Sequence, residues 1–151
     1  MSPLALLHRW RHRHGYGLHS PWVYALVREA LCETAAYYAF RSLHGTAADE
    51  QLFRLALWLK ADTLMAEGLS TSARQHILAA MPHIQLHSFR EESIRDSSCV
   101  IVEDIRRAGK DLWQSILAHP RRTAAFDIRL PRTHRGIAFF SPQRHRQLYT
   151  L

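Results

Sequence analysis

The sequence predicts an α/β fold in which two helices precede a mostly parallel sheet, and the sheet ends in an antiparallel hairpin. Three observations lead to this prediction. Residues 20–60 carry apolar side chains at helical spacing. Beyond residue 61, short apolar runs alternate with helical segments. Near the C-terminus, two strand-like runs are separated only by a turn that contains proline.

Two helices are expected before the first strand. Ser20 and Pro21 are typical of a helix start, because serine caps free N–H groups and proline suits the first helical position. Apolar residues then repeat at helical spacing to about Tyr38, and a second repeat covers residues 47–60. We therefore expect residues 1–60 to form a helical N-terminal extension.

The sheet is expected in residues 61–151. The spacing of apolar residues predicts a strand at 63–66, a helix at 73–81, strands at 83–89 and 98–102, and a helix at 107–119. Residues 98–102 form a continuous apolar run, which is typical of a strand buried in a parallel sheet.

The last part of the chain is expected to form antiparallel strands. The runs at 123–128 and 136–140 are too close in sequence to pair in parallel, so they predict an antiparallel hairpin. Residues 147–151 are a candidate for a further strand. The whole pattern predicts a parallel sheet that is finished by antiparallel strands.

Composition indicates a single domain, residues 1–151. With 151 residues, of which 47% are hydrophobic, the chain can bury one core but is short for two. Cys32 and Cys99 lack the spacing of a zinc site or a disulfide framework. No apolar run is long enough for the core of a signal peptide or for a membrane span. A reducing cytoplasm is therefore the expected compartment.

A metal site is not expected. The chain has 11 histidines, but none combines with a cysteine or a placed carboxylate at a recognised ligand spacing. We considered five of them: His12, His14, His19, His83 and His87. His19 is expected to be a structural junction at the helix start, and a role in a substrate lid is the alternative.

The chain is strongly basic, with a formal net charge of +7. Residues 121–151 contain seven arginines and one acidic residue, so this tail carries +6. The arginines are Arg121, Arg122, Arg129, Arg132, Arg135, Arg144 and Arg146. Such a charge attracts phosphate-rich partners such as nucleic acid or anionic lipid headgroups. The alternative is that the arginines only solvate exposed strands and turns.

Aromatic residues interleave with arginines around the first expected helix. They are Trp10, Trp22 and Tyr24, near Arg9, Arg11 and Arg13. Aromatic faces beside cations suit stacking on single-stranded nucleic acid. The alternative is that these residues pack the helix against the sheet or against a second copy of the chain.

The segment HGYGLHSPWVYALV at residues 14–27 resembles an N-terminal signature of a group of bacterial class I S-adenosylmethionine-dependent methyltransferase-like proteins. Three further stretches resemble the same family in the same order: residues 52–65, residues 100–105 with Trp113, and Asp127 with residues 136–140. The resemblance covers most of the chain. It implies a Rossmann-like sheet, S-adenosylmethionine as cofactor and methyl transfer to an unidentified acceptor.

The family's first strand ends in an acidic residue, and a loop with two glycines then approaches the cofactor. The resemblance places Ala66 at the acidic position, Gly68 at the first glycine and Ser72 at the second, while Glu67 is shifted by one residue. Gly68, Ser70 and Ser72 are therefore the expected cofactor-binding residues of this loop. The alternative is a plain strand-to-helix turn that a serine caps.

Glu103 and Asp104 complete the expected cofactor-binding set. They follow the buried run 98–102, at the strand end where open α/β sheets bind ligands. The alternative is that Asp104 caps the next helix.

The predicted sheet is shorter than that of the family. Only about ten residues separate the strand near residues 84–88 from the strand at 99–102, whereas a parallel crossover usually takes a dozen or more. The family's additional strand and helix in this interval, and the acidic residue that binds the cofactor ribose, have no counterpart. A shortened sheet also leaves an edge uncovered, which predicts association of two copies.

Two hypotheses about function follow. The first is a degenerate S-adenosylmethionine-dependent methyltransferase-like protein, whether or not it still transfers methyl groups. The second is a non-enzymatic basic module that binds nucleic acid or a protein partner. Saturable cofactor binding favours the first, and a steep loss of nucleic-acid affinity with salt favours the second.

Overall fold

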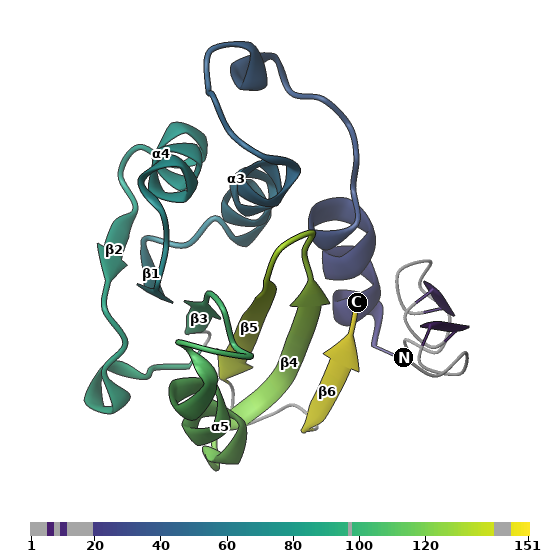
Figure 1. The fold of residues 1–151 in the computed structure, drawn as a ribbon. Helices are drawn as coiled ribbons and strands as arrows, with labels where there is room; N and C mark the ends of the chain where they lie inside the picture. The colour runs from purple at the N-terminus through teal and green to yellow at the C-terminus, as the bar shows by residue number, and fades with distance from the viewer. Residues whose placement is uncertain (1–5, 8–9, 12–19, 97, 141–145) are drawn as a thin grey trace. The chain divides into compact units, whose positions relative to one another are not determined.

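A computed structural model of the chain describes residues 6–7, 10–11, 20–96, 98–140 and 146–151 (Figure 1). The described residues form an α/β structure with one six-stranded mixed sheet and the helices α2 to α5. Within the described part of the chain, no helix is both long enough and apolar enough to cross a membrane.

The chain divides into two compact units. Residues 1–62 and 70–84 form the first, which we call the helical unit, and residues 63–69 and 85–151 form the second, the sheet unit. The chain leaves the helical unit after residue 62, close to the expected boundary at 60, and residues 70–84 then return to it.

The helical unit contains α2 (Pro21–Leu26), α3 (Ala47–Leu59) and α4 (Thr71–Ala80). A π-helical turn (Val27–Leu31) extends α2, and a 3₁₀ turn (Tyr38–Arg41) precedes α3. The hydroxyl of Ser20 caps α2 by accepting a hydrogen bond from the N–H of Val23, and Pro21 is the first helical residue.

The expectation that the first helix continues to Tyr38 is wrong, because the helix ends at Leu31. Just beyond this end, one Glu33 carboxylate oxygen accepts hydrogen bonds from the N–H groups of Thr34 (2.6 Å) and Ala35 (2.7 Å). These two bonds lower the pKa of Glu33, and they engage N–H groups that a further helical turn would have used. Of the apolar residues that follow, those at 35–37 lie in irregular chain, and Tyr38 begins the 3₁₀ turn.

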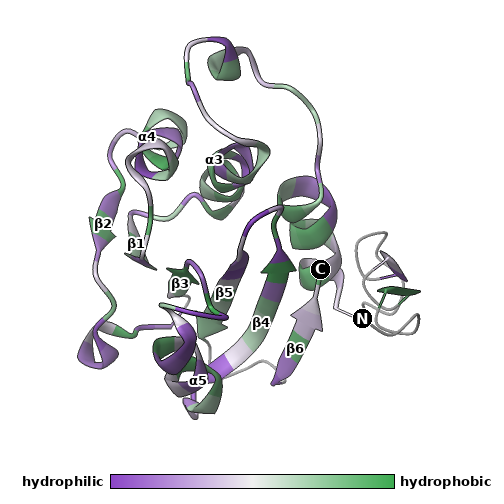
Figure 2. Cartoon of the chain, in the orientation of Figure 1, coloured by the Kyte–Doolittle hydropathy of each residue, from purple (hydrophilic) through white to green (hydrophobic). Residues whose placement is uncertain are grey.

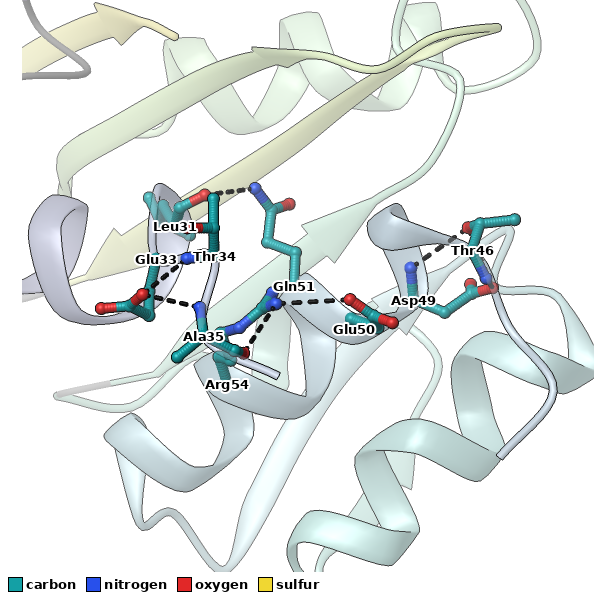
Figure 3. Close-up of polar contacts among 9 residues, drawn as sticks. All are labelled: Leu31, Glu33, Thr34, Ala35, Thr46, Asp49, Glu50, Gln51 and Arg54. Carbon is teal, nitrogen blue, oxygen red and sulfur yellow. Dashed lines mark hydrogen bonds and ion pairs between the residues drawn. The ribbon is translucent and has the colours of Figure 1, made fainter. Parts of the chain in front are cut away.

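Helix α3 is held at its start and along one side (Figure 3). Thr46 and Asp49 form a capping box at its N-terminus. The side-chain amide of Gln51 donates a 2.7 Å hydrogen bond to the carbonyl of Leu31, and the Arg54 guanidinium donates to the carbonyl of Ala35. Both bonds fasten the irregular segment after the π-helical turn onto α3.

The sheet unit holds all six strands. They are β1 (Thr63–Glu67), β2 (Gln85–His87), β3 (Cys99–Val102), β4 (Arg122–Arg129), β5 (His134–Phe140) and β6 (Gln147–Thr150). Their order across the sheet is β2-β1-β3-β5-β4-β6.

Parallel and antiparallel pairs occupy different parts of this sheet. Strand β1 is parallel to both β2 and β3, whereas β5 lies antiparallel between β3 and β4, and β6 is parallel to β4. The predicted hairpin of residues 123–128 and 136–140 is thus confirmed as antiparallel. In the connection from β2 to β3, the described residues form a 3₁₀ turn (Glu91–Ser93) and no α-helix.

The core of the sheet unit lies between the strands and α5 (Lys110–Ala118). Strand β3 is buried and apolar along its length (Figure 2). The ring of Trp113 packs on β5 at Gly136, where an added Cβ would lie 2.6 Å from it. Only glycine leaves room there for the indole, so α5 can lie against the sheet.

Candidate functional site

The expected cofactor loop begins at the end of β1. Gly68 follows β1 with φ of 74°, a left-handed conformation that favours glycine. A Cβ at this position would lie 3.2 Å from Cβ of Glu103, which follows the neighbouring strand β3. The carboxyl ends of β1 and β3 therefore meet as expected, but the space at Gly68 faces the Glu103 side chain.

The acidic groups at this edge are already bound to other parts of the sheet unit. An oxygen of Glu103 lies 2.6 Å from Nε of Arg135, which is only 2% exposed. Glu67 accepts a 2.6 Å hydrogen bond from the N–H of Phe89. Both carboxylates thus have partners within the sheet unit, and both help to hold the loops after β1 and β3 in place.

Asp104 shapes the turn that follows β3. It has φ of 52°, and its carbonyl accepts hydrogen bonds from the N–H groups of Arg107 and Gly109. Its carboxylate accepts a 3.2 Å hydrogen bond from the Thr133 hydroxyl. The alternative role that we considered, capping of the next helix, is wrong: Gly109 is the N-cap of α5 and the helix starts at Lys110, not at 107.

Ser70 and Ser72 belong to the helical unit. Ser70 is the N-cap of α4 and accepts a 3.1 Å hydrogen bond from the N–H of Ala73. The Ser72 hydroxyl is bonded to the carbonyl of His44 (3.0 Å) and the carboxylate of Asp49 (3.1 Å). The five expected cofactor residues are thus divided between the two units, and each has a structural partner or role within its own unit.

Further charged groups of the sheet unit gather beside Asp104, around a hollow of about 270 Å³ that Asp104 helps to line. Four arginines line it together with one histidine: Arg106, Arg107, Arg129, Arg132 and His134. We call this feature the arginine hollow. Its lining residues come from the turn after β3 and from the turn between β4 and β5.

Hydrogen bonds join these two turns. The N–H of Ile105 donates to the carbonyl of His134 (3.1 Å), and the Thr133 hydroxyl donates to Asp104. Within the hairpin turn, the N–H of Leu130 donates to the carbonyl of Thr133 (2.9 Å). The positions of the arginine backbones are therefore fixed before any ligand arrives.

Asp127 organises one side of the arginine hollow. This carboxylate, 9% exposed, is ion-paired with Arg106, and its other oxygen lies 2.9 Å from Nδ1 of His134. A smaller adjoining cavity of about 190 Å³ is lined by Asp127 and Arg106, and by Lys110 and Gln114 of α5. The buried carboxylate of Asp127 thus holds the side chains of Arg106 and His134 close to each other.

The sequence prediction found the excess of arginine but not the arginine hollow. Arg129 and Arg132 flank the proline turn of the hairpin, whereas Arg106 and Arg107 come from a turn more than twenty residues earlier. The adjacent pair of arginines directly after a buried strand was the available signal, because loops at such strand ends carry binding residues.

Other candidates contribute no site in the described chain. No group of three His, Cys, Asp or Glu residues that could hold a metal occurs among the described residues, and His83 and His87 are exposed. Trp22 packs edge-to-face on Trp58, at 5.5 Å between ring centroids. His12, His14 and His19 lie outside the described residues, as does the first part of the methyltransferase-like signature, residues 14–19.

Comparison with protein-family models, with curated proteins and with solved structures found no match for this chain.

Proposed function

We propose that the chain is a degenerate S-adenosylmethionine-dependent methyltransferase-like protein that has lost methyl transfer and acts as a non-enzymatic basic binding module. A Rossmann-like sheet is part of this proposal. It is supported by the parallel strands β2, β1 and β3 followed by the antiparallel strand β5, and by a left-handed glycine directly after β1.

The residues at the carboxyl ends of β1 and β3 do not fit the cofactor. The observation that carries this conclusion is the position of Glu103, whose side chain lies against Gly68 and is paired with the buried Arg135. A ligand that approached Gly68 on the side where a Cβ would lie would meet Cβ of Glu103, whose carboxylate is held by Arg135. Moving Glu103 away from this place would break its ion pair with a buried guanidinium, which is costly.

Binding of an anionic partner is supported by the charge of the chain. The net charge of +7 favours association with polyanions, and four arginines line one hollow in the sheet unit. We expect the protein to act in the cytoplasm, where the Cys99 thiol stays reduced. Burial raises the pKa of this thiol, which keeps it protonated and unreactive.

Calorimetric titration with S-adenosylmethionine and S-adenosylhomocysteine tests the loss of the cofactor site. We expect no saturable heat and no rise in melting temperature at millimolar ligand, whereas a ligand that bound the folded state would stabilise it, and the more so the tighter it bound. Micromolar binding of either compound would overturn the proposal and would make an active methyltransferase the function to test next.

A further inference from the structure

We infer that the arginine hollow binds the phosphodiester backbone of a nucleic acid. This inference rests on the proposed binding function and names the place and the chemistry of the contact. The site consists of Arg106, Arg107, Arg129 and Arg132, with His134 beside them. Guanidinium groups suit this ligand because their planar N–H donors match the oxygens of a phosphate.

The charge of the hollow matches a backbone of singly charged phosphates. Four guanidinium groups face two carboxylates, Asp104 and Asp127, which leaves a charge of +2 with His134 neutral. Two consecutive phosphodiesters carry the opposite charge. The carboxylates also bind Thr133, Arg106 and His134, and their negative charge is already included in this +2.

The accessibility of the arginines also suits a long, flexible anion. All four arginines are exposed, including Arg106, which pairs with Asp127. A strand that lies in the hollow can be contacted from both walls, since the arginines come from two turns that hydrogen bonds join.

The rest of the chain favours a polymer over a single phosphate. Residues 121–151 alone carry +6, so attraction extends beyond the hollow and increases the rate of encounter with a polyanion. A ligand with one phosphate would gain little affinity from the charges outside the hollow, because salt at physiological concentration screens their field over about 8 Å.

The test compares two double variants with equal loss of charge. R107Q/R132Q removes two exposed arginines of the hollow, and R74Q/R90Q removes two exposed arginines outside it. Circular dichroism and thermal melting check that each variant is folded. R107K/R132K keeps the charge and is expected to restore part of the affinity, since lysine binds phosphate as a point charge.

Binding is measured by fluorescence anisotropy with a labelled single-stranded oligonucleotide of mixed sequence and about 20 nucleotides, over about 50 to 200 mM salt. We expect the wild-type affinity to fall steeply with salt. R107Q/R132Q should bind about tenfold more weakly, because it loses two charge-assisted contacts. The slope of log affinity against log salt should fall by about 1.4, the value for two phosphates of a single strand.

The outcomes separate failure of the site from failure of the function. If the wild-type protein does not bind the oligonucleotide even at low salt, the binding function itself is wrong. If it binds and both double variants weaken binding equally, the function stands and the arginine hollow is not its site. Competition by inorganic phosphate at the same phosphate concentration, or a preference for vesicles that contain phosphatidylserine, would overturn the nucleic-acid inference.

Discussion

Glu103 and Arg135 pair within the sheet unit at a position that solvent hardly reaches, with side chains 14% and 2% exposed. Such an ion pair adds little to the free energy of unfolding compared with a well-packed apolar pair, but removing one partner leaves a buried charge without its counterion. Loss of stability is therefore expected to be largest when only one of the two residues is replaced.

We predict that R135M lowers the free energy of unfolding by about 3 kcal/mol, since Glu103 loses its partner. R135M/E103Q should regain about half of this loss, because no charge is then left without a partner. Urea denaturation at neutral pH measures both values. A double variant no more stable than R135M would show that lost packing of the arginine, and not the orphaned carboxylate, causes the effect.

Gly68 is constrained by its backbone and by its neighbour. Its φ of 74° disfavours other residues, and an added Cβ would lie 3.2 Å from Cβ of Glu103. We predict that G68A costs about 1 to 3 kcal/mol of stability. G68N is the control, since asparagine tolerates left-handed backbone better than alanine does. If thermal melting gives G68N the same loss as G68A or a larger one, crowding by Glu103 is responsible instead.

At the scale of elements, Arg122 joins three parts of the sheet unit. Its guanidinium donates to the carbonyls of Leu117 near the end of α5 (3.1 Å), of Thr123 in β4 (3.0 Å) and of Gln147 in β6 (3.0 Å). Burial, and secondarily Arg146, lower the pKa of Arg122, but an arginine stays protonated at neutral pH. One charged group thus satisfies three carbonyls and holds β6 beside β4.

We predict that R122Q destabilises the protein by about 2 kcal/mol, because three carbonyls, one of them in a buried hydrogen bond, lose their charged donor. Amide exchange in β6 should increase, and the N–H of Leu151, which donates to the carbonyl of Asp127, is one reporter. R121Q is the matched control, since Arg121 forms an exposed pair with Asp96 and such pairs are worth less than about 1 kcal/mol. Equal exchange in both variants would contradict the role given to Arg122.

The strands were predictable because each is a local pattern. The run Cys99–Val102 is wholly apolar and wholly buried, and the proline turn between β4 and β5 left an antiparallel pair as the only arrangement. The end of the first helix was not predictable, because a carboxylate that binds the next two N–H groups overrides the apolar spacing. Helix α5 starts late for a similar reason, the turn at Asp104.

The candidate site was predictable only in part. The sequence placed Gly68, Glu103 and Asp104 near one another at strand ends, but the ion pair between Glu103 and Arg135 depends on β5 lying next to β3. The arginine hollow likewise depends on contact between two turns far apart in sequence. Contacts of this kind follow from strand order, which no local pattern encodes.

At the scale of the whole molecule, the described sheet has two edges, β2 and β6. Strand β2 has three residues, which is short for a stable pairing, whereas β6 has four and carries Leu148, which is 48% exposed. Unpaired backbone groups beside an exposed apolar side chain favour pairing with another strand. We therefore expect two copies of the chain to associate through β6.

Sedimentation velocity over a range of concentrations measures this association. The chain has a mass of 17.5 kDa, so we predict a shift toward twice that mass as the concentration rises. L148K should reduce the dimer fraction, because a lysine on an edge strand opposes pairing. L78K is its control, since Leu78 is a similarly exposed leucine on α4. A strict monomer at high concentration would contradict association of the chain. Equal loss of dimer in both variants would show that the copies associate through a surface other than β6.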